Sequence, residues 1–208
     1  MIGSTTFIAY VAIVLGFVFI PGPATLLTVT RSASSGMRVG IATGVGIAAG
    51  DVVHTVMAIV GISAIIAASA MLFSIIKYIG AAYLVYLGIR AILEKAPAGF
   101  IRRGPAITAS RAFHQAILAE VLNPKTALFF LAFLPQFVRP ESGSVALQLS
   151  VLGIVYVLLG LASTVVYAVG AGRLGDFLRR NPTVLKWQGK VVGGIFCALG
   201  LRLALERR

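Results

Sequence analysis

Long apolar runs with very few charges dominate this sequence, and they decide which solvent surrounds it. Six such runs, each bounded by charged or turn residues, fall at about 5–30, 40–67, 69–92, 113–138, 145–171 and 187–205. Because a helix rises 1.5 Å per residue, about 20 apolar residues cross a hydrocarbon core of about 30 Å. Charged residues make up 12% of the chain, whereas soluble domains carry about 25%. The runs therefore predict an all-α integral membrane protein with six transmembrane helices.

Two of the six runs contain residues that interrupt helices. The first run carries the sequence PGP at residues 21–23, and the fourth carries Asn123 and Pro124 and then Pro135. Proline lacks a backbone N–H, and irregular backbone at membrane depth survives only where it is buried in protein or lines a polar cavity. We therefore expect broken first and fourth helices. For the first run, a simple kink near the helix end is the competing interpretation.

The basic residues indicate orientation. The net charge of +12 would suggest nucleic-acid binding in a soluble protein, but here the lysines and arginines lie mainly in the short loops on one side of the six crossings. Basic residues in short loops stay cytoplasmic. The pattern predicts that both termini face the exterior, although the arginines near the C-terminus argue against it. It gives no sign of a nucleic-acid partner.

An internal repeat divides the chain into two halves. Residues 87–94, LGIRAILE, resemble residues 199–206, LGLRLALE, at a shift of 112, and the same shift aligns Phe17 with Phe129 and Pro23 with Pro135. The polar segment 95–111 separates the halves, at about 5–94 and 112–206. Each half holds three crossings, an odd number, so the second must enter the membrane inverted. We predict one transporter domain of two inverted three-helix repeats, with the substrate site where the broken helices meet.

The second run carries a carboxylate at membrane depth. Asp51 lies about ten residues into the run, near the midplane, where an ionised side chain costs about 2.5 to 3.5 kcal/mol and usually faces a cavity or a partner. His54 follows three residues later, on a neighbouring helical face. The pair could pass a proton, because histidine titrates near neutral pH. Alternatively, Asp51 only ties helices together and His54 is satisfied in the core.

The fourth run holds a second polar group, formed by Glu120, Asn123, Pro124, Lys125 and Gln136. Backbone freed by the proline could bind the ammonium of a zwitterion, while the lysine and nearby amides could bind its carboxylate. The alternative is that the glutamate and the lysine pair with each other and stabilise the fold. Together with Pro21, Gly22 and Pro23 at the first break, these side chains, Asp51 and His54 are the predicted substrate and proton pathway.

Four blocks of the sequence resemble the LysE/RhtB family of amino-acid exporters, the homoserine, threonine and lysine efflux type. The blocks are PGP at residues 21–23, the glycine-spaced stretch ending in Gly50 and Asp51, KYIGAAYLVYLG at 77–88, and NPKTALFFLAFLPQF at 123–137. The resemblance implies export of amino acids or related small metabolites, driven by the proton motive force, across a bacterial inner membrane. It also favours a homodimer. The matching positions are Pro21, Pro23, Gly50, Asp51, Asn123, Pro124 and Lys125.

Two other classes compete with an exporter. A divalent metal or other ion transporter on the same scaffold would need clustered Asp, Glu, His or Cys ligands, and the membrane runs offer Asp51, His54 and Glu120 with little else. A membrane enzyme is disfavoured, because the chain has one cysteine and no HExxH sequence. We expect no enzyme activity, no cofactor and no metal, and we expect an amino-acid substrate, protons and membrane lipid as partners.

Overall fold

The computed structural model describes residues 2–19, 22–68, 70–93 and 106–180, together with individual residues between 187 and 205. Every regular element in these ranges is a helix. The α-helices are α1 Ser4–Val18, α2 Pro23–Ser35, α3 Met37–Ala68, α4 Ala70–Leu93, α5 Ala109–Val121, α6 Pro124–Leu128 and α7 Val145–Arg180. Between α6 and α7 lie a π-helical turn, η1 Phe129–Phe133, and two 3₁₀ turns, η2 Leu134–Phe137 and η3 Pro140–Ser142.

Two described helices are long and apolar enough to cross a membrane, over Met37–Ile62 in α3 and Val145–Ala171 in α7. Two bent pairs raise the number to as many as four: α1 with α2, at 50°, and Ala109–Val121 with Pro124–Phe137, at 45°. The predicted breaks in the first and fourth runs are therefore confirmed. Among the described residues two to four spans are found, so the expected six are not confirmed. In α4 the stretch found is the shorter Ala81–Arg90, and the sixth run is described only in part.

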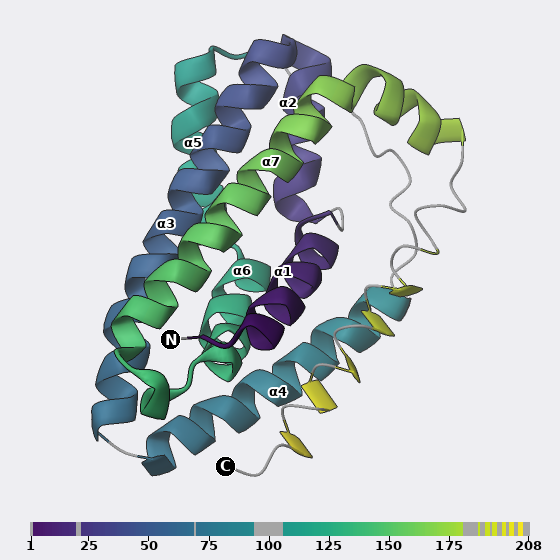
Figure 1. Cartoon of the computed structure of the whole chain (residues 1–208). Coiled ribbons are helices and arrows are strands. Elements are labelled where there is room, and N and C mark those ends of the chain that lie inside the picture. Colours follow the sequence, from purple (N-terminus) through teal and green to yellow (C-terminus); the bar gives the residue numbers. More distant parts are fainter. Residues whose placement is uncertain are drawn as a thin grey trace.

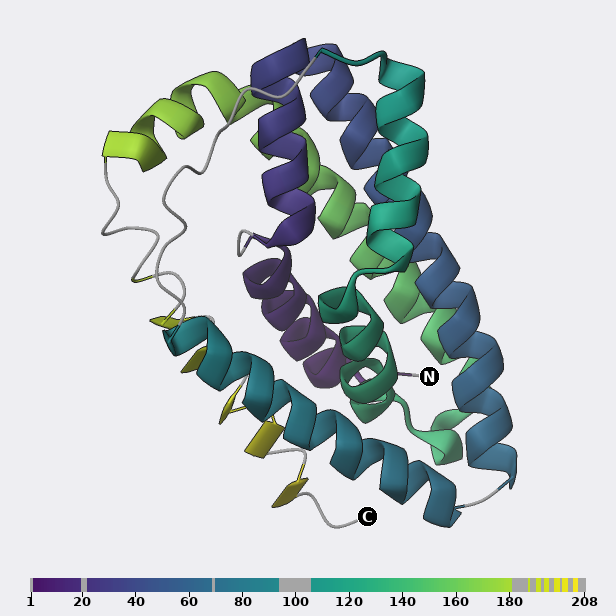
Figure 2. The ribbon, with the colours of Figure 1, turned by 180° about the vertical axis from the view of Figure 1, so that it is seen from behind.

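The two bent pairs run in opposite directions through the molecule (Figure 1). From α1 to α2 the chain passes from the middle of the view to its top, whereas from α5 to α6 it descends. The long helices α3 and α7 are also antiparallel and lie side by side, and α3 packs most extensively against α5 and α7. Seen from behind, α1 and α6 lie next to each other, and α4 runs obliquely across the lower part of the view (Figure 2).

Proline position explains where each broken helix restarts. Pro23 is the first residue of α2 and Pro124 is the first residue of α6, where the missing N–H costs nothing because no carbonyl precedes it in the helix. The sequence shift of 112 paired Pro23 with Pro135, which lies in η2. In the structure it is Pro124 that begins a helix after the second break, as Pro23 does after the first.

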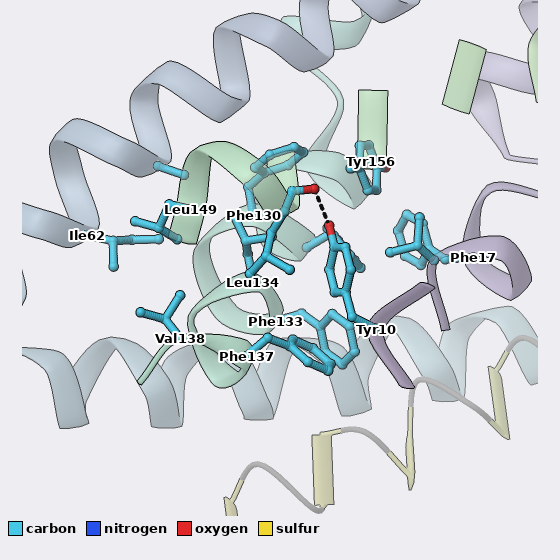
Figure 3. Close-up of a cluster of buried hydrophobic side chains, with 14 of the residues drawn as sticks. Tyr10, Phe17, Ile62, Phe130, Phe133, Leu134, Phe137, Val138, Leu149 and Tyr156 are labelled. Carbon is cyan, nitrogen blue, oxygen red and sulfur yellow. Dashed lines mark hydrogen bonds between the residues drawn. The ribbon is translucent and has the colours of Figure 1, made fainter. Parts of the chain in front are cut away.

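An aromatic core packs around α1, η1 and η2 (Figure 3). The Phe129 ring packs at centroid distances of 4.7 Å from both Phe17 and Tyr156. The hydroxyl of Tyr10, fully buried, donates a hydrogen bond of 2.7 Å to the backbone oxygen of Leu152. These contacts pack α1 and the π-helical turn η1 against α7. They therefore hold both broken helices in place.

Glycines let α3 approach its neighbours closely. A Cβ placed on Gly44 would lie 2.7 Å from Thr164 Oγ1 of α7, and one on Gly50 would lie 2.6 Å from the Cβ of Glu120 in α5. Small residues allow such backbone approach between membrane helices. Because Asp51 directly follows Gly50, this close contact with α5 also brings Asp51 to the second break.

Candidate functional site

The first break leaves backbone oxygens at the end of α1, and side chains from other helices satisfy them. The backbone oxygens of residues 17, 18 and 19 accept hydrogen bonds, in that order, from Lys125 Nζ at 3.3 Å, Ser163 Oγ at 2.8 Å and the Tyr167 hydroxyl at 2.7 Å. The last carbonyls of a helix have no partner within it. Here α6 and α7 supply the partners, so the break is fixed in place by side-chain donors.

The other side of the same break is the amino end of α2. Gly22 is the N-cap residue in extended conformation, and no side chain caps the helix. The first hydrogen bond back along the chain runs from Leu26 N to Gly22 O, at 2.9 Å. The N–H groups of the first turn therefore have no intrahelical acceptor, and the positive end of the helix dipole lies at this point.

The second break is organised around the carboxylate of Glu120, which is 3% exposed. Asn123 caps α6, because its Oδ1 accepts from the backbone N–H of Lys125 at 3.0 Å. Its amide nitrogen lies 3.1 and 3.2 Å from the two oxygens of Glu120, and the Thr126 hydroxyl donates to one of them. Glu120 thus ties the end of α5 to the start of α6.

Asp51 projects from α3 into the space between the breaks. Its side chain is 2% exposed, and its Oδ1 has no hydrogen-bond partner among the described residues. Its carboxyl group lies close to the carboxyl group of Glu120 and shares the cavity with Lys125. Gly160 of α7 leaves room beside it, since a Cβ there would lie 3.3 Å from Asp51 Oδ2. A buried acceptor without a partner is costly, so this oxygen is the strongest sign of a ligand or proton site.

These groups surround one cavity of about 410 Å³, including its open mouth. Its lining comes from both breaks and from α3 and α7, and consists of Phe17, Val18, Gly22, Pro23, Ala24, Thr25, Ile47, Asp51, Glu120, Asn123, Lys125, Thr126, Tyr156, Gly160 and Thr164. Two carboxyl groups and one ammonium therefore share a small, largely buried space. Such a space suits a small polar solute that carries charge of both signs.

His54 is placed beside this cavity and does not belong to its lining. Its Nε2 lies 2.9 Å from the backbone oxygen of Glu120, to which it donates a hydrogen bond, and its ring stacks on Phe130 with 5.8 Å between centroids. The bond satisfies one of the carbonyls freed at the end of α5. The contact fits the alternative in which this histidine is satisfied in the core, although it does not test a proton relay.

Most of the predicted pathway residues come together in the cavity. Gly22, Pro23, Asp51, Glu120, Asn123 and Lys125 all line it. Pro124 is exposed at the start of α6 and Gln136 is half-buried in η2, both outside the lining, and Pro21 lies outside the described residues. The sequence reasoning did not identify Thr126, Tyr156, Gly160 and Thr164, although hydroxyl groups within the fourth and fifth apolar runs were a signal for three of them.

Comparison with known proteins identifies the family. Residues 15–207 match the LysE type translocator family. The chain belongs to this family of translocators. Its members are transporters and not enzymes, so both the predicted family and the predicted absence of enzyme activity are confirmed.

Relatives of this translocator cover almost its whole length. An uncharacterized membrane protein of Vibrio cholerae is 32% identical over 200 residues, covering 96% of this chain and 97% of the relative. An uncharacterized membrane protein of Bacillus subtilis is 32% identical over 213 residues, with 96% and 98% covered. A homoserine/homoserine lactone efflux protein of Salmonella typhimurium is 30% identical over 187 residues, covering 90% of each chain. No solved structure matches.

Proposed function

We propose that this LysE type translocator exports amino acids or closely related small metabolites from the bacterial cytoplasm across the inner membrane, by proton antiport. The observation that carries the proposal is Asp51, which lines a cavity between two broken helices and whose buried Oδ1 has no hydrogen-bond partner among the described residues. The relative from Salmonella typhimurium, named as an efflux protein for homoserine and homoserine lactone, supports the outward direction and a small solute related to amino acids.

Competition for one carboxylate would couple the two fluxes. A carboxylate buried at membrane depth is stabilised either by a proton or by a bound cation. When the ammonium of the solute occupies Asp51 the proton is excluded, and when a proton occupies it the solute is released. A transporter that changes its open side with the solute bound and again with the proton bound, but not with the site empty, exchanges solute for proton.

The hydrogen bonds distinguish the two carboxylates. Glu120 accepts from Asn123 and Thr126 and so holds the second break together, whereas Oδ1 of Asp51 has no hydrogen-bond partner among the described residues. We therefore assign the proton and the ammonium to Asp51 and a positioning role to Glu120. The relay from Asp51 to His54, and the places of Pro124 and Gln136 in the pathway, stay predictions.

We also propose the inverted repeat, as one domain with repeats at about 5–94 and 112–206 joined by the linker 95–111. At the shift of 112, Val85 corresponds to Cys197, and Cys197 Sγ lies 3.7 Å from Val85 O. Gly88 corresponds to Gly200, and each packs against the other repeat, near Cys197 and Val85 respectively. Equivalent residues that meet in this way are expected around a two-fold axis between inverted halves, and the antiparallel bent pairs agree with it (Figure 1).

The metal or ion transporter remains the second candidate, but the charges of the cavity disfavour it. Lys125 lines the same space as Asp51 and Glu120, and its ammonium would repel a divalent cation from the two carboxylates. A zwitterion, in contrast, can pair its ammonium with a carboxylate of the cavity and its carboxylate with the lysine. The homodimer and the exterior position of both termini are kept as predictions from the sequence.

Efflux from intact cells tests the proposed function. Cells producing the protein are fed a panel of dipeptides, and release of each amino acid is followed with and without an uncoupler. We expect uncoupler-sensitive loss of one or a few amino acids, which Asp51→Asn abolishes at equal membrane abundance. The matched control is Glu141→Gln, the same change of carboxylate to amide at an exposed site in η3. Release of no amino acid would reject the proposal, and normal release by Asp51→Asn would remove Asp51 from the mechanism.

A further inference from the structure

The cavity has chemically different ends, and the difference arises at the first break. Where a helix is interrupted, it exposes carbonyl acceptors at the end of one segment and N–H donors at the start of the next. At this break the acceptors of residues 17–19 are occupied by Lys125, Ser163 and Tyr167. In the described part of the break, the backbone oxygens of residues 17–19 therefore already have donors.

The segment that carries the donors, in contrast, lines the cavity. Gly22, Pro23, Ala24 and Thr25 all belong to its lining, and α2 has no side-chain cap. An uncapped helix of this length attracts an anion at its amino end, through its N–H groups and its dipole. Lys125 adds a full positive charge at the same place, because a Cβ on Gly22 would lie only 3.3 Å from Lys125 Nζ.

A second and independent observation marks the opposite charge. Asp51 lines the same cavity, and its Oδ1 is buried and has no hydrogen-bond partner in the described part of the chain. The other carboxylate of the cavity, Glu120, already accepts from Asn123 and Thr126. The acceptor left for a donor ligand is therefore on α3, and the donors left for an acceptor ligand are on α2.

We propose that the amino end of α2 together with Lys125 binds the free carboxylate of an α-amino acid, while Asp51 binds its ammonium. This proposal rests on the exporter function and deepens it, because it fixes the orientation of the solute and its chemical class. Free α-amino acids fit both ends. Amino-acid esters and amides lack the anion, and α-hydroxy acids lack the cation, so each satisfies one end only.

One substitution imitates the ligand. In Gly22→Asp, the new carboxylate would stand at the N-cap of α2 beside Lys125, where aspartate is a favoured cap, and would occupy the proposed anion site. Gly22 has φ −130° and ψ −168°, which other residues adopt without strain. Gly22→Asn is the matched variant, since it adds the same shape without the charge. We expect affinity for the amino acid to fall at least tenfold further in Gly22→Asp than in Gly22→Asn, the usual size of a charge-assisted hydrogen bond.

Binding to the purified full-length protein in lipid nanodiscs tests the proposal without transport. The probes are the common L-amino acids and L-homoserine, each compared by calorimetry with its methyl ester and its α-hydroxy acid. We expect one or a few free amino acids to bind, with at least tenfold weaker binding of the ester and of the hydroxy acid. Asp51→Asn should weaken the amino acid and its ester alike and leave the residual binding of the hydroxy acid unchanged.

Three results would overturn the inference: an ester that binds as tightly as its amino acid, equal affinities of Gly22→Asp and Gly22→Asn, or binding of no probe. The inference and the exporter function fail separately. An ester bound as tightly as the amino acid, with export intact, rejects only the orientation. Oriented binding without any export from cells rejects only the transport function.

Discussion

Gly50→Ala is predicted to push α3 away from α5 and so to displace Glu120, which lines the cavity. The added Cβ would lie 2.6 Å from the Cβ of Glu120, 3.0 Å from its Cγ and 3.3 Å from the backbone oxygen of Ile117. Carbon atoms pack best at about 3.5 to 4.0 Å, so the helices must move apart by about 1 Å. None of the atoms in conflict is the free end of a flexible side chain, and hence the movement falls on the backbone.

The expected cost follows from that displacement. Inserting a methyl group into a packed interface costs about 1 to 3 kcal/mol, whereas replacing glycine by alanine within a helix gains about 0.5 to 1 kcal/mol. Gly61→Ala is the matched control on the same helix, because a Cβ at Gly61 meets nothing within 4 Å. It should show the gain alone. We therefore expect Gly50→Ala to be less stable than Gly61→Ala by about 1 to 3 kcal/mol.

Unfolding of the two purified variants in the same detergent, by heat or by titration with a denaturing detergent, measures this difference. Amino-acid binding gives a second readout, because a shift of about 1 Å at Glu120 moves the residues of α6 that it holds, and misplacement of this size can reduce function about a hundredfold. If Gly50→Ala and Gly61→Ala unfold alike and bind alike, the close contact between α3 and α5 does not position the site, and the reasoning fails.

Two further predictions concern the contacts that hold the breaks. Asn123→Ala removes the cap of α6 and two hydrogen bonds to Glu120, so it should lower stability by about 0.5 to 2 kcal/mol and weaken export; unchanged export at reduced stability would show that Glu120 needs no partner to position the site. Tyr10→Phe removes the hydrogen bond to Leu152 and should cost about 0.5 to 1.5 kcal/mol without changing the affinity for the amino acid; a change in affinity would extend the site into the aromatic core.

The sequence predicted the breaks because proline and asparagine act locally. PGP and Asn123-Pro124 cannot continue an ordinary helix wherever they lie, and α2 and α6 each begin at the proline that follows the interruption. The same local logic selected Asp51 and Glu120, since a charge within an apolar run needs a cavity or a partner. These predictions required no knowledge of which helices are neighbours.

What the sequence did not provide is the assignment of partners across helices. A pair between Glu120 and Lys125 was one of two alternatives for the fourth run, and it came from their separation in the chain. In the structure Glu120 accepts hydrogen bonds from Asn123 and Thr126, and Lys125 donates one to the backbone oxygen of Phe17, on another helix. Such choices depend on how α1 and α6 approach each other, which is decided by non-local packing of the aromatic core.

The contribution of the fifth run was missed for the same reason. Gly160 and Thr164 line the cavity, and Ser163 and Tyr167 satisfy the end of α1, yet nothing in the local pattern of α7 connects it with residues about 145 positions away. Hydroxyl groups in an apolar helix more often bond to their own preceding turn. Only the packing of α7 against α1 shows that these hydroxyl groups donate to the backbone oxygens at the first break.

Proton movement driven by the solute tests the central claim most directly. The protein is reconstituted in liposomes that contain a pH-sensitive dye and the amino acid identified from cells, and the outside is then diluted into medium without the amino acid. The account predicts that outward flow of the amino acid acidifies the lumen, and that Asp51→Asn at equal reconstitution gives no acidification. Outward flow of the amino acid with no change in luminal pH, or equal acidification by Asp51→Asn, would contradict it.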